Sequence, residues 1–435
     1  MSFLVLVMTW GWIPINIILF RKFTPQKAIL ISVIGGLLFL PVIKLDIPMI
    51  YYGKNTAIAV SLLSGIGFSG KIRDMAFSPG WLDIPIIIWC IMSPFLSVLA
   101  NDLGTYNAVA AVVQTSLDYG VFYMAGRIFF SDKEALRLLC RGIIIGGLIY
   151  VPLVLFEVRM SPQLSRIIYG FTPTSFAELI RYGGFRPIVF MDHGLMVALW
   201  MTTAYIVSFW LLSTREITEI KKIPMIVIVI LLLISTILCK CSAAIVYLIF
   251  GTLGYYLKSK RIFNILIIII PVYILLRISG ILPADTIIDY LSKIFNAERI
   301  ESLSTRLQQE ELFGIKALER PLLGWGWIER AWPINPLTGQ NAISMIDSVY
   351  LAVFSVRGYL GLLSLYSVLL LGPWKVMKSR TASIDAAVIS LVLILFIIDT
   401  LLNGMINPVF ILSSGALISF SEKLKYDKVT EAADL

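Results

Sequence analysis

Long apolar runs separated by short polar breaks constrain this chain more than any other feature of its sequence. Residues 223–238 and 262–276 hold almost no polar side chain. A soluble fold cannot bury so many such runs, whereas a bilayer accommodates each run of roughly twenty residues as a spanning helix. The sequence therefore predicts a polytopic membrane protein.

The composition agrees, with 58% hydrophobic and 14% charged residues, where soluble domains are about half apolar and a quarter charged. The runs do not alternate polar and apolar residues as barrel strands do, so the spanning elements are expected to be helices. We predict an all-α fold of about thirteen transmembrane helices. They would form a single transmembrane domain over residues 1–435.

Two local features refine this prediction. The apolar run 224–256 is too long for one span, and Lys240 divides it, because a charge at the centre of a bilayer costs ~2.5 kcal/mol or more. The glycine pairs at 35–36 and 146–147 are expected to let helices pack closely.

Basic residues mark the ends of the spans. With the spans alternating, the basic loops fall on one side; they cover residues 21–27, 127–141, 215–222, 258–261 and 375–380. By the positive-inside rule this side is the cytoplasm, which places the N-terminus outside and the C-terminus inside. The net charge of +9 is then an orientation signal, and no nucleic-acid partner is expected.

Two long loops are expected on the outer face, over residues 157–193 and 277–346. The second interrupts the apolar character of the chain with many charges and three tryptophans. Apolar residues at helical spacing over 300–318 predict a short helix there, with Arg306 and Glu310 off its apolar stripe.

The first loop gathers Arg181, Arg186 and the only histidine, His193. Guanidinium groups grip phosphates through paired hydrogen bonds, and a histidine accepts a proton near neutral pH. The alternative is a loop held by arginine–acid pairs with a satisfied histidine.

Further candidates follow along the chain. Trp325 and Trp327 suit either an interfacial belt or stacking on sugar rings near Arg306. Asp347 can act as a base or as an ion-pair partner, and an arginine as deep in a span as Arg357 is a functional candidate. Lys240 adds a cation on the outer face, unless it only marks the turn.

Neither a metal nor a cofactor is expected. The four cysteines lack zinc-site spacing and do not form a disulfide framework, so they are expected to be small apolar fillers; they are Cys90, Cys140, Cys239 and Cys241. One histidine cannot build a histidine-based metal site.

Several short motifs, in this order, resemble the bacterial O-antigen ligase and O-antigen polymerase superfamily. They are Phe-Arg-Pro-Ile-Val-Phe at 185–190, Lys240 beside Ser-Ala-Ala, Arg306 leading into Pro-Leu-Leu-Gly-Trp-Gly, Asp-Ser-Val-Tyr-Leu at 347–351, and Gly-Tyr-Leu-Gly-Leu-Leu at 358–363. The likeness covers about residues 140–375.

The resemblance implies a polytopic enzyme of the bacterial inner membrane with a large periplasmic loop. Such enzymes transfer an oligosaccharide from a polyprenyl-pyrophosphate carrier to a glycan acceptor without a metal. By motif position, Arg186, Arg306 and Lys240 would bind the pyrophosphate, with Arg181 beside them. Membrane lipids and other polysaccharide-assembly proteins would be further partners.

Ligases of this superfamily carry a histidine where this chain has Asp347, which favours a polymerase over a ligase. The base would be Asp347 or His193. Trp325, Trp327 and Tyr350 would contact the glycan.

Two other classes of function remain open. A lipid-linked glycan flippase or transporter would suit the polar residues within spans, Asp118, Asp399 and Asn403. Against it, no internal repeat relates the two halves of the chain. A scaffold in polysaccharide assembly is the third possibility, but it would not require cations at the motif positions.

Overall fold

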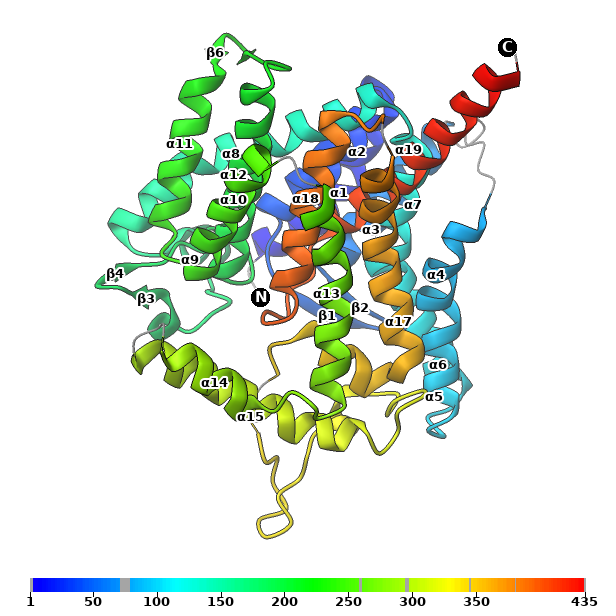
Figure 1. Cartoon of the computed structure of the whole chain (residues 1–435), viewed down its shortest axis with the longest axis vertical. Coiled ribbons are helices and arrows are strands. Elements are labelled where there is room, and N and C mark those ends of the chain that lie inside the picture. Colours follow the sequence, from blue (N-terminus) through cyan, green and yellow to red (C-terminus); the bar gives the residue numbers. More distant parts are fainter. Residues whose placement is uncertain are drawn as a thin grey trace.

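The computed structural model describes residues 3–70, 79–257, 260–293, 297–343, 346–379 and 381–433. Helices make up most of it (Figure 1). The α-helices are α1 (Phe3–Lys22), α2 (Pro25–Phe39), α3 (Lys54–Phe68), α4 (Ile84–Ile87), α5 (Ser93–Leu99), α6 (Thr105–Thr115), α7 (Val121–Phe129), α8 (Lys133–Met160), α9 (Leu164–Tyr169), α10 (Gly194–Ser213), α11 (Met225–Leu238), α12 (Ser242–Leu257), α13 (Lys260–Ile278), α14 (Ala284–Ser292), α15 (Ala297–Ala317), α16 (Ile328–Ala331), α17 (Val349–Lys378), α18 (Ile384–Asp399) and α19 (Pro408–Ala433).

Shorter elements join these helices. Two π-helical turns, η3 (Ile88–Met92) and η4 (Ser116–Gly120), connect α4 to α5 and α6 to α7, and two 3₁₀ turns are η2 (Trp81–Asp83) and η5 (Phe176–Leu179). Three antiparallel hairpins are β1 (Lys44–Ile47) with β2 (Ile50–Gly53), β3 (Ile180–Arg181) with β4 (Gly184–Phe185), and β5 (Glu219–Ile220) with β6 (Ile223–Pro224).

The mostly helical fold confirms the expected class, but the number of full-length spans was overestimated. Five helical stretches in the described residues are long and apolar enough to cross a membrane: Phe3–Lys22, Trp81–Leu99, Lys133–Met160, Gly194–Ser213 and Val349–Lys378. Other expected spans form shorter helices. The one near Leu62 is the 15-residue α3, and the one near Leu393 is the 16-residue α18, which ends at Asp399.

Helix α10 lies at the centre of the bundle and packs against α8, α11, α12 and α18. The expected role of the glycine pairs in packing is confirmed. A Cβ built on Gly147 would lie 2.4 Å from Ala204 Cβ of α10, and one on Gly36 would lie 2.5 Å from Ile58 Cγ1 of α3. A larger residue at either position would push the neighbouring helix away.

The predicted break at Lys240 is also confirmed. Helix α11 ends at Leu238 and α12 begins at Ser242. Lys240 itself takes a left-handed backbone conformation with φ of 50°. The chain therefore reverses at the charged residue. All four cysteines are buried and unpaired with one another, as expected of apolar fillers.

Helix α17 is interrupted at Gly358, whose φ of 60° and ψ of −159° lie in a region open essentially to glycine alone. The break leaves backbone groups of α17 without helical partners, and the segment 321–326 binds them. Tyr359 N donates to Pro321 O at 2.7 Å, and Trp325 N donates to Ser355 O at 2.8 Å. Two further bonds, Leu360 N to Leu322 O and Gly326 N to Val356 O, complete the junction. The Gly-Trp-Gly motif is thus fixed to the broken helix.

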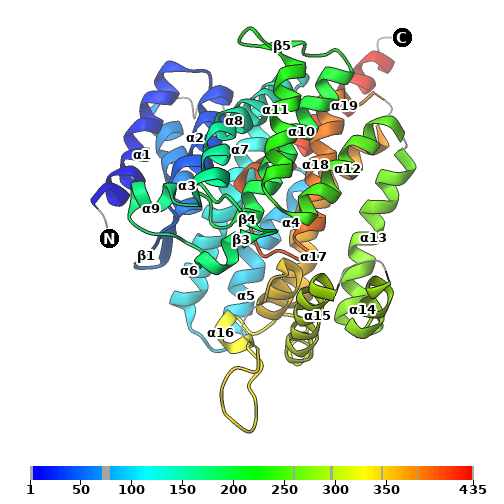
Figure 2. The same cartoon turned by 90° about the vertical axis from the view of Figure 1, so that its left-hand side faces the viewer.

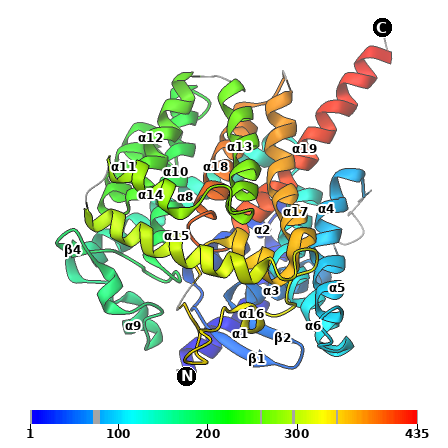
Figure 3. The same cartoon turned by 60° about the horizontal axis from the view of Figure 1, so that its bottom comes forward.

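The long loops gather at one end of the molecule. The β3–β4 hairpin, α14, α15 and α16 lie toward this end, whereas the β5–β6 hairpin and the end of α19 lie toward the other (Figure 2). Helix α15 crosses the loop-bearing end below the bundle (Figure 3). Two parts of the chain that are far apart in sequence can therefore build one site there.

The helix predicted over 300–318 is confirmed as α15, but its buried face is not the expected one. Glu310 is buried, whereas Ile315 is 66% exposed. Glu310 accepts a hydrogen bond from Tyr350 Oη at 3.1 Å and pairs with Arg277 of α13 at 3.5 Å. Burial raises the pKa of the Glu310 carboxyl, and hydrogen bonds and the Arg277 charge oppose that shift. These partners on α13 and α17 allow an acid to face inward.

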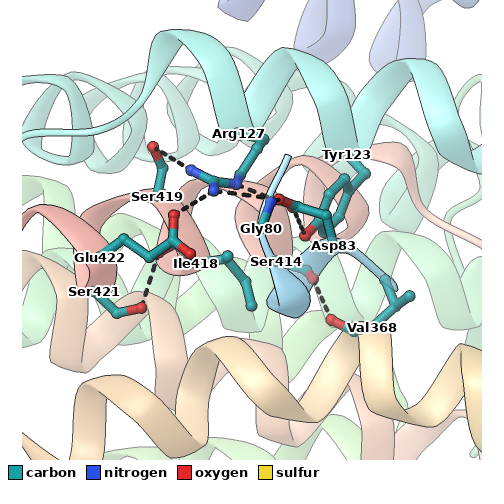
Figure 4. Close-up of polar contacts among 10 residues, drawn as sticks. All are labelled: Gly80, Asp83, Tyr123, Arg127, Val368, Ser414, Ile418, Ser419, Ser421 and Glu422. Atoms are coloured by element: carbon teal, nitrogen blue, oxygen red, sulfur yellow. Dashed lines mark hydrogen bonds and ion pairs between the residues drawn. The ribbon is translucent and has the colours of Figure 1, made fainter. Parts of the chain in front are cut away.

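At the other end, a buried ion-pair network joins α7 to α19 (Figure 4). Arg127 Nε lies 3.0 Å from Asp83 Oδ1, and its Nη2 pairs with Glu422. Tyr123 Oη donates to Asp83 at 2.8 Å. Close helix packing accompanies the network, because a Cβ on Gly126 would lie 1.9 Å from Leu412 O.

Candidate functional site

The β3–β4 hairpin supplies the first part of the site. Its tight turn is Tyr182-Gly183, and both residues have positive φ, 48° and 64°, as a two-residue hairpin turn requires. The turn brings the hairpin against the α11–α12 break. Lys240 Nζ donates to Tyr182 O at 3.4 Å, and Tyr182 Oη lies 2.9 Å from Ser242 Oγ.

Glycine at 184 makes this contact possible. A Cβ there would lie 1.9 Å from Lys240 Nζ. The ammonium group therefore rests directly over the hairpin backbone, on the strand that follows Arg181 and precedes Arg186.

Arg186 is the buried cation of the site. It is 8% exposed, and Nη2 donates to Lys240 O at 3.3 Å. Its Nε is buried with no hydrogen-bond partner among the described residues. Gly194 provides the space, because a Cβ there would lie 2.5 Å from both Cγ and Cδ of Arg186.

Among the residues that the structure describes, no carboxylate forms an ion pair with Arg186. Burial is the main cause that lowers the pKa of its guanidinium, and the charges of Arg181 and Arg306 lower it further, while Cys241 and Tyr182 oppose the shift. A buried cation that is incompletely paired favours an incoming anion, because the anion supplies the missing charge and acceptors.

Arg306 and Asp347 meet in an ion pair. Helix α15 carries Arg306 to the start of α17, where its Nε lies 2.9 Å from Asp347 Oδ2. The two side chains are 36% and 26% exposed. A partly exposed pair of this kind is worth only about 0–1 kcal/mol. An anion of higher charge can therefore displace Asp347 from Arg306.

His193 stands at the start of α10. Its Nδ1 accepts the backbone N–H of Leu195 at 3.1 Å, and its Nε2 lies 3.5 Å from Glu178 Oε2. Burial and, after it, the charge of Arg186 lower the pKa of the imidazole. The neutral ring, with Nδ1 as acceptor and the proton assigned to Nε2, fits both contacts. Its lone pair is thus used to cap α10.

This placement gives a pH prediction. Because the folded-state pKa lies below the ordinary value of about 6.5, the unfolded chain takes up a proton first as the pH falls. The stabilisation from neutral His193 is present above that value and is lost below it. We expect wild-type protein to lose more stability between pH 7 and pH 5 than His193→Asn, which keeps a cap without titrating. Thermal unfolding in detergent measures this, and parallel curves would contradict it.

The aromatic candidates have separate positions. Trp325 is half-buried, with Lys316 Nζ 4.0 Å from its ring centroid and its Nε1 donating to Lys316 O at 3.0 Å. Tyr350 is 1% exposed and bonds to Glu310, so it joins α15 to α17. Of the three, Trp327 is the residue that lines a cavity.

The structure therefore joins the predicted cations from separate parts of the chain. Hydrogen bonds join Arg186 to Lys240 and Lys240 to the hairpin that carries Arg181, and an ion pair joins Arg306 to Asp347. The charges of Arg181 and Arg306 act on Arg186, and we call Arg181, Arg186, Lys240, Arg306 and Asp347 the cation cluster. His193 directly precedes Gly194, which packs against the Arg186 side chain. Arg357 lies elsewhere, at the cavity of Trp327.

Sequence reasoning missed Tyr182, Glu178 and Gly194. The Gly183-Gly184 pair was the available signal for Tyr182, because a turn there places the residue before it at the hairpin tip. Gly194 gave no signal, since its role depends on the position of the Arg186 side chain.

No group of three or more His, Cys, Asp or Glu side chains that could hold a metal ion occurs within the described ranges. In comparison with known proteins, neither a protein-family model nor a curated protein matches this sequence.

Proposed function

We propose that this chain is a surface-polysaccharide polymerase that transfers oligosaccharide units from a polyprenyl-pyrophosphate donor to a growing glycan. The supporting observation is Arg186, a buried cation that pairs with no carboxylate in the described part of the chain. It is hydrogen-bonded to Lys240, and the charges of Arg181 and Arg306 act on it. Four cations with one carboxylate suit a ligand with several negative charges, and a pyrophosphate is such a ligand.

In this proposal the cation cluster stabilises the leaving group. The acceptor hydroxyl oxygen attacks the anomeric carbon, and the bond from that carbon to the pyrophosphate oxygen breaks. The departing pyrophosphate keeps the electron pair, and its charge is matched by Arg186, Arg306 and Lys240. Preorganised cations in a site of low dielectric favour this step strongly, without a general acid.

Asp347 is the proposed base. Pyrophosphate on Arg306 would release the Asp347 carboxylate from its ion pair, and the freed carboxylate would accept the proton of the acceptor hydroxyl. Such proton transfer contributes roughly 10²–10⁴-fold to a rate. His193 fits this role less well because its acceptor nitrogen caps α10.

The proposal places the protein in the bacterial inner membrane with the cation cluster at the periplasmic face. The N-terminus would be periplasmic and the C-terminus cytoplasmic. Both long loops lie toward one end of the molecule, which supports a single outer site for a donor whose polyprenyl chain stays in the lipid.

The test is the size of lipid-linked glycans in a deletion strain, released by mild acid and resolved by mass. We expect single repeat units to accumulate, because a polymerase is the step that joins them. Long chains left on the carrier would instead indicate a ligase. An unchanged pattern would contradict glycan transfer and favour a transporter or scaffold.

A further inference from the structure

A second polar site lies apart from the cation cluster. It is a cavity of about 850 Å³ whose walls come from the β1–β2 hairpin, α3, α6, η4, residues 326–329 and α17 near Arg357. Ligand pockets in proteins commonly measure about 300–1,000 Å³. The cavity is therefore large enough for a ligand of several rings.

A hydrogen-bonded group forms one side of the cavity. Asp118 accepts from Thr56 Oγ1 at 3.3 Å and from Gln114 Nε2 at 2.8 Å. Gln114 Oε1 also accepts the backbone N–H of Tyr51 at 2.8 Å, which holds the β1–β2 hairpin on α6. The carboxylate and amide oxygens are thus fixed in position and need no rearrangement to accept from a ligand.

Arg357 provides fixed donors at the same cavity. Its Nη2 donates to Thr115 Oγ1 at 2.6 Å, its Nη1 to Trp89 O at 3.3 Å, and its guanidinium stacks 4.2 Å over the Trp89 ring. Trp89 lies in the π-turn η3, and Thr115 directly precedes the π-turn η4. Single π-turns inside helices recur at functional sites.

The charges around the cavity nearly cancel, unlike those of the cation cluster. Four acids and three bases line it: Asp46, Asp118, Asp192, Glu329, Lys44, Lys54 and Arg357. Aromatic rings complete the wall, with Tyr51 51% and Tyr106 59% exposed and Trp327 half-buried. Balanced charge, fixed donors and acceptors, and aromatic faces suit an uncharged ligand with both hydroxyl groups and apolar ring faces.

We propose that this cavity binds uncharged, hydroxyl-rich sugar rings and holds the acceptor end of the glycan; the acceptor role rests on the proposed function. Its position supports that role, because the segment 187–193 runs from Arg186 of the cation cluster to Asp192 in the wall of the cavity. Asp192 lines the cavity, and Lys54 Nζ donates to Phe190 O at 2.7 Å. Gly194, two residues after Asp192, packs against Arg186, because a Cβ built on it would lie 2.5 Å from Arg186 Cγ and Cδ.

The test uses full-length protein in lipid nanodiscs. The probe is a set of neutral oligosaccharides prepared by mild acid hydrolysis of the surface polysaccharide of the producing strain, and calorimetry measures binding. These probes lack pyrophosphate, so the cation cluster cannot retain them. We expect wild-type protein to bind and Trp327→Ala and Asp118→Asn to bind at least about tenfold more weakly.

Two controls make the assignment specific. Trp81→Ala removes another exposed tryptophan, one that lies under Lys375 outside this cavity, and should bind like wild type. Arg186→Gln should also bind like wild type. Trp327→Phe keeps a ring and should recover part of the affinity, which separates a sugar contact from a folding defect.

The sugar site would be overturned if wild-type protein did not bind the oligosaccharides, or if Trp327→Ala and Asp118→Asn bound them as tightly as wild type. Elongation of lipid-linked repeat units by the same preparations is measured in parallel. If both variants elongated with the same dependence of rate on acceptor concentration as wild type, the acceptor role alone would be overturned. Oligosaccharide binding without elongation by wild type would overturn the proposed function and the acceptor role, but not the sugar site.

Discussion

Replacing Arg186 with Gln is expected to lower the rate of glycan transfer by roughly 10²–10³-fold, the loss of about 2.7–4 kcal/mol that follows removal of one preorganised donor from a developing anion. The substitution should not lower the stability of the fold. The wild-type guanidinium is buried and has no carboxylate partner within the described ranges, so its removal relieves a desolvation penalty. We therefore expect an unchanged or higher thermal midpoint together with the loss of activity.

The matched control is Arg166→Gln, a change at an exposed residue of α9 within the same long loop. It should leave both transfer and stability unchanged. Arg186→Lys keeps the charge but loses the guanidinium fork, and should fall between wild type and Arg186→Gln. Transfer at the wild-type rate by Arg186→Gln in a reconstituted assay would contradict the placement of pyrophosphate at this residue.

Gly358→Ala is expected to destabilise the protein by about 2–6 kcal/mol. The backbone conformation of Gly358 costs another residue ~1–3 kcal/mol. A Cβ there would also lie 2.3 Å from Leu322 C, and overpacking of this kind adds ~1–3 kcal/mol. Displacement of the 321–326 segment would break its backbone bonds to α17. Thermal unfolding in detergent, followed by size-exclusion chromatography, measures the effect.

Gly314→Ala is the control for that substitution. Gly314 lies inside α15 without a positive φ, and nothing lies within 4 Å of a Cβ built there. Alanine has the better helix propensity, so this variant should be as stable as wild type or more stable by up to about 1 kcal/mol. Equal stability of Gly358→Ala and Gly314→Ala would contradict the fixed junction between the segment 321–326 and α17.

The sequence was most informative where one residue conflicts with its local environment. Lys240 in a long apolar run predicted a reversal, and the chain reverses there, because a charge in mid-bilayer is costly whatever the rest of the fold does. The helix over 300–318 was likewise predictable from local periodicity. Its inward face was not, because the burial of Glu310 depends on Arg277, which lies 33 residues earlier on another helix.

The number of spans and the cavity escaped prediction for related reasons. Apolar content shows that a segment can enter a membrane, but the length of a helix depends on where tertiary contacts and polar residues end it. The cavity wall includes a short β1–β2 hairpin tied to α6 through Gln114 and Tyr51, 63 residues apart. No local pattern in the sequence indicates such a contact.

The network around Arg127 bears on how the chain is assembled during synthesis. Its contact with Ser419 joins residues 292 positions apart, so α7 completes its packing only after the chain has been made as far as α19. Asp83 precedes Arg127 by 44 residues and can neutralise it in the meantime. The face at Gly126 stays uncovered until α19 arrives. The packing of α7 against α19 is thus among the late contacts of the bundle to form during synthesis.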